Sequence, residues 1–196
     1  MTIRHTTAAD LDAVMRIYAE ARVFMRANGN ETQWPGDYPP REYIEGDIER
    51  GVSYVCEKDG EVVATFYYNV ERDATYERIK GNWLDGSGAF AESYDAAAAA
   101  HDRELCAAFD SGATSDASYA PVGVCHRLAR TTARTDAKGV GAACIEWCFE
   151  QCGSLKIDTH VDNAPMRVLL DKLGFTYCGI IWVLDGEERI AFQKTK

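Results

Sequence analysis

An alternation of strands and helices in the second half of the chain limits the possible folds more than any other feature. The predicted elements are strands at 122–131, 154–159, 175–184 and 189–193, and helices at 139–152 and 163–173. A strand, a helix and a second strand in the same sheet form a parallel crossover, which is right-handed in nearly all proteins. Asp185-Gly186, between the last two strands, is a hairpin signal. We therefore expect a sheet with one parallel crossover and an antiparallel end.

The first half of the chain predicts helices followed by antiparallel strands. A short strand near Ile3 precedes a helix that ends near Gly29, and Pro40 fits the start of a second helix. Residues 52–57 and 61–70 are rich in Val, Tyr and Phe and flank another Asp-Gly hairpin signal. The whole pattern indicates an α+β fold, an α/β/α sandwich with a mixed, largely antiparallel sheet of about six to seven strands and about four helices.

Residues 86–120 interrupt this rhythm. The stretch contains an alanine run at 96–100 and a serine-rich tail, and its helical apolar stripe is thin. We interpret it as an inserted helical or irregular segment that packs on the domain without forming its core. No linker divides the chain, so residues 1–196 are expected to form a single domain.

The charge balance argues against several classes of partner. Lys and Arg total 21 against 31 Asp and Glu, a formal net charge of −10, which repels nucleic acid and anionic membranes at long range. No apolar run reaches the ~18 residues of a membrane span, and the polar N-terminus does not resemble a signal peptide. We expect a cytoplasmic protein with neither a nucleic acid nor a membrane as partner; a homodimer is compatible with these expectations.

The seven cysteines do not form a metal site. No C-x-x-C pair occurs, and Cys144, Cys148 and Cys152 recur at helical spacing. The first and last of these would lie ~12 Å apart along a helix, too far to share one ion. They are expected to be small hydrophobic residues on a buried face, and no metal is expected.

The turn before the helix at 139–152 carries the clearest chemical signal. Gly139 and Gly141 let the backbone approach a ligand, and the first N–H groups of a helix, with its dipole, favour anions. Arg134 and Lys138 add positive charge. A tight structural connection is the alternative. A dinucleotide fingerprint is excluded because Cys144 replaces its third glycine, and the sequence is no P-loop.

With its flanking segments, this turn resembles the GCN5-related N-acetyltransferase (GNAT) family over nearly the whole chain. The similar features are residues 126–129 (HRLA) before the turn, residues 158–163 (DTHVDN) after it, and the later LGF of residues 173–175. The resemblance implies acetyl-CoA as acyl donor, with strand backbone on the pantetheine arm and turn N–H groups on the pyrophosphate. The candidate cofactor-binding residues are Leu128, Ala129, Arg130, Arg134, Thr135, Lys138, Gly139, Val140, Gly141, Ala142 and Asn163. A helix N-cap is the alternative role of Asn163.

Two positions depart from the family pattern. Asp136 stands three residues before Gly139, where the family carries Arg or Gln, and we expect its carboxylate to point to solvent. Leu170 stands where many members carry a tyrosine that protonates the departing thiolate; Tyr177 or water is a candidate substitute.

The expected reaction is direct attack of a primary amine on the thioester in a ternary complex. The acceptor would be a small molecule, an amino acid or a peptide. His126 is the candidate proton acceptor because it lies on the relevant strand and titrates near neutrality. His160 is weaker, and a structural hydrogen bond is the alternative role of His126. Two other functions stay open: a non-catalytic acyl-CoA-binding or regulatory domain, and an interaction module that docks a partner through the insertion or through Trp34 and Tyr38.

Overall fold

The strands form one continuous sheet in the computed structural model, which describes residues 1–110 and 122–196. They are β1 (Thr2–His5), β2 (Ser53–Lys58), β3 (Glu61–Val70), β4 (Arg78–Gly81), β5 (Ala89–Phe90), β6 (Gly123–Arg130), β7 (Ser154–Thr159), β8 (Thr176–Trp182) and β9 (Glu188–Thr195). Their order is β1-β2-β3-β6-β7-β9-β8-β4-β5. Neighbours are antiparallel except β6–β7 and β4–β5. The α+β class with one parallel crossover is confirmed, and β4 and β5 extend the expected sheet.

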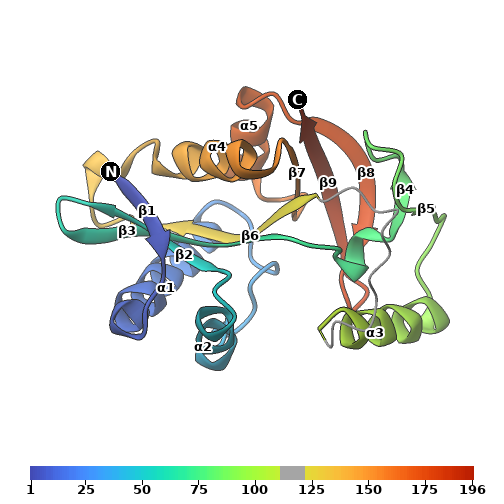
Figure 1. Cartoon of the computed structure of the whole chain (residues 1–196), viewed down its shortest axis with the longest axis horizontal. Helices are drawn as coiled ribbons and strands as arrows, with labels where there is room; N and C mark the ends of the chain where they lie inside the picture. The colour runs from blue at the N-terminus through green and yellow to red at the C-terminus, as the bar shows by residue number, and fades with distance from the viewer. Residues whose placement is uncertain (111–121) are drawn as a thin grey trace.

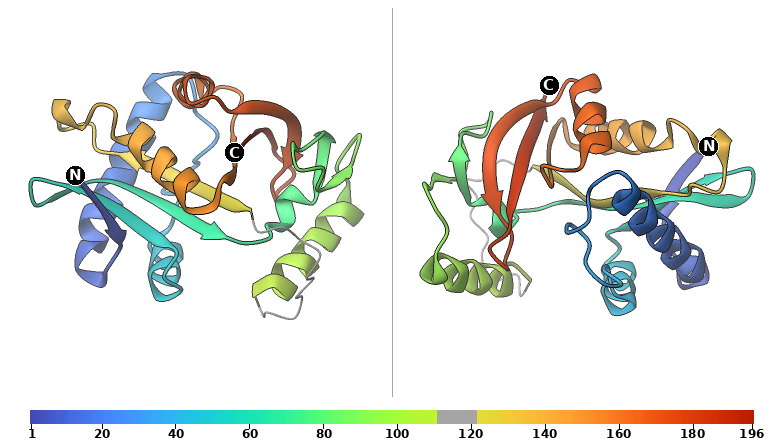
Figure 2. Two further views of the ribbon diagram at one scale, coloured as in Figure 1. Left: turned by 45° about the horizontal axis from the view of Figure 1, so that its top comes forward. Right: turned by 180° about the vertical axis from the view of Figure 1, so that it is seen from behind.

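Helices cover both faces of this sheet. In the described part of the chain they are α1 (Leu11–Ala27), α2 (Arg41–Glu49), α3 (Ala96–Asp110), α4 (Val140–Cys152) and α5 (Ala164–Lys172). Helices α4 and α5 lie on one face, whereas α1, α2 and α3 lie on the other (Figures 1 and 2). This is the expected three-layer sandwich of four helices, and α3 lies in the segment that was expected to be a helical or irregular insertion. None of these helices has the length and apolar character needed to cross a membrane.

The cysteines of α4 serve as core residues, as their spacing predicts. Cys144 and Cys148 are fully buried, and Cys152 is half-buried. They pack with Phe66 of β3 and Leu155 of β7 in the largest apolar cluster. The thiols behave as small hydrophobic groups between a helix and the sheet.

Strand β4 has four residues, too short for a periodic pattern to reveal it. It pairs with β8 where two glycines face each other. A Cβ on Gly81 would lie 2.0 Å from the carbonyl oxygen of Cys178, and one on Gly179 would lie 2.3 Å from that of Lys80. The close approach therefore requires glycine in both strands.

The segment expected as an insertion divides into parts with different attachments. Residues 86–90 are tied to the sheet, because the buried Lys156 of β7 donates to Ser87 Oγ at 2.6 Å and β5 pairs with β4. Tyr94 stacks on Trp182 with ring centroids 5.9 Å apart. No described side chain of α3 belongs to an apolar cluster. Residues 111–121, which include the serine-rich tail, lie outside the described residues.

A buried ion pair anchors α3. Asp102 is 1% exposed and accepts a hydrogen bond from Arg78 Nε of β4 at 3.1 Å. We expect Asp102→Asn to lower the free energy of unfolding by about 1–3 kcal/mol, because the bond loses its charge and Arg78 loses its counterion. Chemical denaturation measures this. Glu104→Gln, on an exposed position of the same helix, should have almost no effect; equal losses in both variants would contradict the anchoring role.

Candidate functional site

The sheet opens between β6 and β7. The two strands pair at Gly123–Leu155 and Val124–Lys156, whereas β7 pairs with β9 along its whole length. Beyond these two pairs β6 and β7 diverge, so one half of the sheet stands steeply to the other (Figure 1). A cavity of about 1660 Å³ lies at this opening and extends under α1, α2 and their connecting loop. It exceeds the ~300–1,000 Å³ of an ordinary ligand pocket, so it has room for two substrates.

A β-bulge shapes the strand that borders this cavity. His126 pairs with Tyr67 and Ala129 with Thr65, so one extra residue of β6 stands between the two pairs. Arg127 lies there with a φ of 52°, and its guanidinium forms a buried ion pair with Asp47 of α2. The ion pair between Arg127 and Asp47 therefore anchors the bulge of β6 at the point where β6 and β7 diverge.

The turn after β6 forms a cationic end of the cavity. Gly139 has a φ of 88°, a backbone conformation that favours glycine. The first hydrogen bond of helix α4 runs from the Ala143 N–H to the Gly139 carbonyl. The N–H groups of the residues between therefore precede the helical ladder. Lys138, Gly139, Gly141 and Ala142 line the cavity, as do Leu128, Ala129 and Arg130. Val140 instead is buried in the core. Among the described residues, no carboxylate pairs with Arg130, Lys138 or Lys172, which gives this end a net positive charge.

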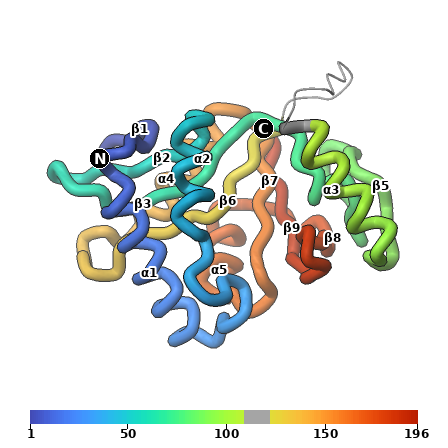
Figure 3. The backbone as a smooth tube through the Cα atoms, turned by 90° about the horizontal axis from the view of Figure 1, so that it is seen from below, coloured from blue at the N-terminus to red at the C-terminus, as the bar shows by residue number. Residues whose placement is uncertain are grey.

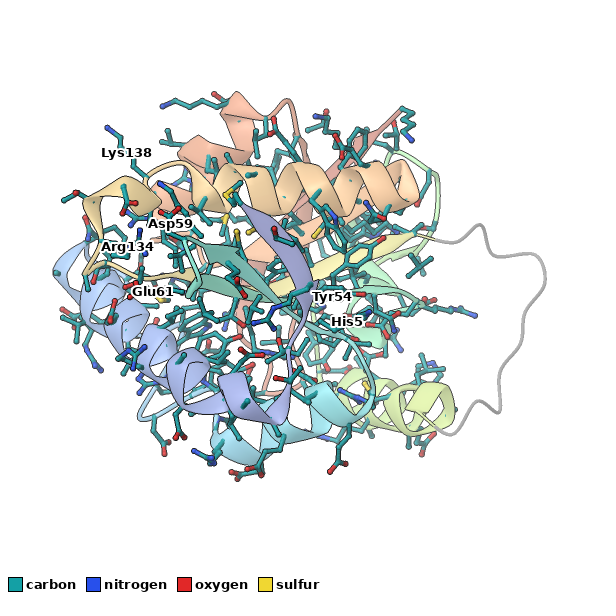
Figure 4. All side chains as sticks on the ribbon, turned by 60° about the vertical axis from the view of Figure 1, so that its left-hand side comes forward. His5, Tyr54, Asp59, Glu61, Arg134 and Lys138 are labelled. Carbon is teal, nitrogen blue, oxygen red and sulfur yellow. The ribbon has the colours of Figure 1, made fainter. Side chains whose placement is uncertain are left out.

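Arg134 does not join this group. Its guanidinium pairs with Asp136 at 2.7 Å, with Glu61 at 2.8 Å and with Asp59 at 3.3 Å. Figure 4 shows it beside Asp59 and Glu61, whereas Lys138 projects away from the turn. Neither Arg134 nor Thr135 lines the cavity, so the structure separates these two candidates from the other cofactor-binding residues.

Asp136 connects the turn to the β2–β3 hairpin through an ion pair. Its side chain is 45% exposed and pairs with Arg134 and with Lys58 Nζ at 2.9 Å. These hydrogen bonds hold the pKa of the carboxyl well below its ordinary value. The carboxylate lies outside the cavity, toward solvent and its two cations.

Helix α5 contributes an amide and two apolar side chains to the cavity. Asn163 caps the helix by accepting from the Met166 N–H at 3.3 Å and donates to Gln33 at 3.1 Å. Met166 and Leu169 line the cavity. Leu170, at the position where many family members carry tyrosine, is fully buried in the core, and its neighbour Leu169 is the residue that lines the cavity.

Tyr177 is not a substitute proton donor. Its side chain is 56% exposed and packs edge-to-face on Phe192 of β9. It does not line the cavity, so the expectation that it meets the leaving thiolate is wrong. His160 also lies off the cavity wall, beside Asp162.

His126 faces the cavity from between two carboxylates. Its Nε2 lies 2.9 Å from Asp73 Oδ2, and its Nδ1 lies 3.5 Å from Asp158 Oδ1. Tyr76 donates to the same Asp158 oxygen at 2.8 Å. Burial alone would lower the pKa of His126, but the hydrogen bonds and charges of the two carboxylates raise it well above its usual value. Asp73 is 53 positions from His126 in the chain and Tyr76 is 82 from Asp158, so no local pattern could reveal this cluster.

The end of the cavity opposite the turn is aromatic and acidic. Trp34 and Tyr38 from the loop between α1 and α2 lie 6.2 Å apart, and Tyr43 packs edge-on against Tyr38. That loop passes under the opening of the sheet (Figure 3). The carboxylates that line the cavity away from the turn include Glu71, Asp73, Asp158 and Asp185. The arginines of this lining, at positions 50, 72, 127 and 189, each form an ion pair with a carboxylate. Within the described ranges, no group of three or more His, Cys, Asp or Glu side chains could hold a metal.

Comparison with known proteins finds likeness in structure alone. No family model matches the sequence, and no curated protein matches it either. A GNAT-family acetyltransferase from Streptococcus agalactiae is 24% identical with a TM-score of 0.74, over 100% of this chain and 95% of the other. A putative acetyltransferase from Staphylococcus aureus is 18% identical with a TM-score of 0.59, over 100% and 99%. A ribosomal-protein-alanine N-acetyltransferase from Brucella melitensis is 17% identical with a TM-score of 0.53, over 100% of both chains. The chain has the fold of the GNAT acetyltransferases.

Proposed function

We propose that this protein is an N-acetyltransferase that passes the acetyl group of acetyl-CoA to a primary amine. One observation carries the proposal: the cavity at the β6–β7 opening has a cationic end at the Gly139–Gly141 turn and an acidic, aromatic end beneath α1 and α2. An anionic cofactor and a cationic acceptor would thus approach the bulge of β6 from opposite sides. The fold shared with acetyltransferases supports the same reading.

The residues at the opening fit acetyl-CoA. A Cβ on Gly141 would lie 3.7 Å from Leu169 and 3.9 Å from Leu128, so glycine leaves a space about the size of a methyl group between two apolar side chains. We propose that this space belongs to the channel for the pantetheine arm. The unpaired edge of β6 offers backbone groups to the amides of a pantetheine arm. Lys138, Gly139 and Ala142, together with Arg130, would hold the phosphates, and Asn163 would lie near the thioester. Bound there, the cofactor supplies an acyl group activated as a thioester.

The chain's own residues would orient the reactants and manage one proton. The side chains that line the opening would hold the acceptor amine next to the acyl carbon. Attack would then no longer depend on a chance encounter of two molecules in solution. Backbone N–H groups at the bulge would stabilise the negative charge that develops on the carbonyl oxygen. His126 would take the proton that the amine loses on attack.

The acceptor is proposed to be a cationic amine of a small molecule, an amino acid or a peptide. Carboxylates attract an ammonium group, and Trp34, Tyr38 and Tyr43 offer ring faces for a cation or an apolar body. The Brucella protein with this fold acts, by its name, on an alanine of a ribosomal protein, so amine acceptors as large as a peptide are compatible with the architecture. We also propose a cytoplasmic location, because the cysteines are free thiols.

A non-catalytic acyl-CoA-binding domain is the second candidate. It is favoured by α5, whose cavity-lining residues near the proposed thioester include Met166 and Leu169 but no tyrosine that could protonate a thiolate. A thiol with a reference pKa of ~8.5 leaves without such help, so the enzyme stays the first proposal.

Calorimetry followed by a turnover assay tests the two candidates. We expect saturable acetyl-CoA binding and release of free CoA thiol with at least one cationic amine from a panel of diamines, amino acids and peptide N-termini. Binding without thiol release from any amine would support the non-catalytic domain. Absence of acetyl-CoA binding would refute both.

A further inference from the structure

Each ring nitrogen of His126 lies near a carboxylate, an arrangement that acetyl transfer by itself does not require. Asp73 precedes the short helix at Ala74–Tyr76, and Asp158 lies on β7, so two separate elements bring a carboxylate to the two ring nitrogens. Asp73 and Asp158 are 17% and 12% exposed, and His126 is 23% exposed. The ring is therefore shielded on its flanks and open to the cavity.

We propose that Asp73 and Asp158 are positioning residues that hold His126 as an imidazolium, so that acetyl transfer needs an alkaline pH. This inference rests on the proposed function. Protonated Nε2 donates to Asp73 at 2.9 Å, and Asp158 lies at ion-pair distance, 3.5 Å, from Nδ1. The imidazolium is attracted by both carboxylates, whereas a neutral ring keeps at most the bond to Asp73, so the two carboxylates favour the cation.

Other groups around His126 do not offset the two carboxylates. From β3, Tyr67 lies 5.5 Å from the imidazole between ring centroids, and its hydroxyl bonds to Glu71, another negative charge. From the Ala74–Tyr76 helix, Tyr76 lies 5.8 Å away, and burial keeps the pKa of its hydroxyl well above the usual value, so it stays neutral.

The nearby cations are engaged elsewhere. Arg127, next in β6, pairs with Asp47, and Arg72 pairs with Glu77 at 2.7 Å. Arg189 of the β8–β9 hairpin pairs with Glu187, while Asp185 of that hairpin adds a further negative charge to the cavity wall. The groups facing the ring are thus neutral or negative on balance.

The proton balance of the step follows. In the reactive form His126 and the acceptor ammonium have each lost one proton to solvent, so that the imidazole and the attacking amine are both neutral. As the nitrogen–carbon bond forms and the carbon–sulfur bond breaks, sulfur leaves as thiolate and the amine proton passes to Nδ1 of this ring, the nitrogen with the longer carboxylate contact at 3.5 Å. The two carboxylates stabilise the imidazolium produced. Because the neutral ring is scarce at pH 7, the rate should rise into the alkaline range. A base held in this way is also stronger once it is neutral.

Titration of the His126 ring by NMR tests the inference without any reaction. The signal is assigned with His126→Gln, and its midpoint is compared in wild type, Asp73→Asn and Asp158→Asn. We expect a wild-type midpoint well above ~6.5 and a fall of about one pH unit or more in each variant. Asparagine keeps the size and an acceptor oxygen for Thr75 or Tyr76, so the local fold should survive.

Asp162→Asn is the matched control. Asp162 lies 3.5 Å from the ring of His160, outside the cavity, so this variant should leave the His126 midpoint unchanged. A wild-type midpoint near 6.5, or midpoints unmoved in both Asp73→Asn and Asp158→Asn, overturns the inference.

The pH profile of kcat/KM then links the cluster to the reaction. Its ascending limb should follow the NMR midpoint and move to lower pH in both asparagine variants, with a lower plateau because the base is weaker. A limb that stays in place while the NMR midpoint moves would show that His126 is not the proton acceptor, which overturns the inference. Failure of the proposed function would instead appear as absent acetyl-CoA binding or turnover in the wild type, with the NMR comparison intact.

Discussion

Replacing Gly141 with valine should abolish acetyl-CoA binding and leave the fold intact. The new side chain would project between Leu128 and Leu169, in the channel proposed for the pantetheine arm. We expect Kd to rise at least about 100-fold, equivalent to ~2.7 kcal/mol. The fold should tolerate the change, because the nearest atoms to a Cβ lie at ordinary contact distances and valine is no worse than glycine inside a helix. Calorimetry and thermal denaturation measure the two effects.

Gly46→Val is the matched control. Gly46 also lies inside a helix and lines the same cavity, but at the acidic, aromatic end beneath α2, and a Cβ there would meet nothing within 4 Å. This variant should bind acetyl-CoA as the wild type does. Unchanged affinity in Gly141→Val, or equal losses in both variants, would place the cofactor elsewhere in the cavity.

Truncating Trp83 should destabilise the protein more than removing any contact of α3. Trp83 is 2% exposed, its Nε1 donates to the Tyr76 carbonyl at 3.0 Å, and the Lys156 ammonium lies 4.4 Å from its ring. We expect Trp83→Ala to lower the free energy of unfolding by ~3–5 kcal/mol, the usual range for a large aromatic removed from a core. Urea denaturation gives the value.

The neighbouring Leu84 provides the comparison. It is 47% exposed, so Leu84→Ala should change stability by no more than ~0.5 kcal/mol. A small loss in Trp83→Ala would mean that residues 82–88 are attached to the domain without supporting it. In that case Lys156 and Ser87 would also be expected to separate easily.

Local pattern was sufficient for most of the elements. The strands at 122–131 and 154–159 and the helix between them match β6, β7 and α4 to within one or two residues at each end. Their hydrophobic spacing and glycine boundaries are short-range properties, which a single sequence contains. Strand β4 was missed because its place in the sheet depends on Gly179, about 100 positions away in sequence.

The turn that we propose for the cofactor could be located from the sequence, whereas the surroundings of His126 could not. Gly139 and Gly141 belong to one turn, and their spacing is enough to indicate a glycine-bounded helix start. The environment of His126 depends on Asp73 and Asp158, which different elements contribute. The same limit applies to Arg134, whose charge is locally conspicuous but neutralised by the hairpin of β2 and β3.

The opening between β6 and β7 also has a mechanical meaning. The hydrogen-bonded ladder that joins β1–β2–β3–β6 to the other half of the sheet passes through two residue pairs, Gly123–Leu155 and Val124–Lys156. We therefore expect relative motion of the two halves of the sheet to be concentrated at that junction. A ligand whose amides bond to the free edge of β6 lengthens the joint and stiffens it. Bound acetyl-CoA would then link the two halves of the sheet as well as serve as substrate, and the folded protein would be most stable with acetyl-CoA bound.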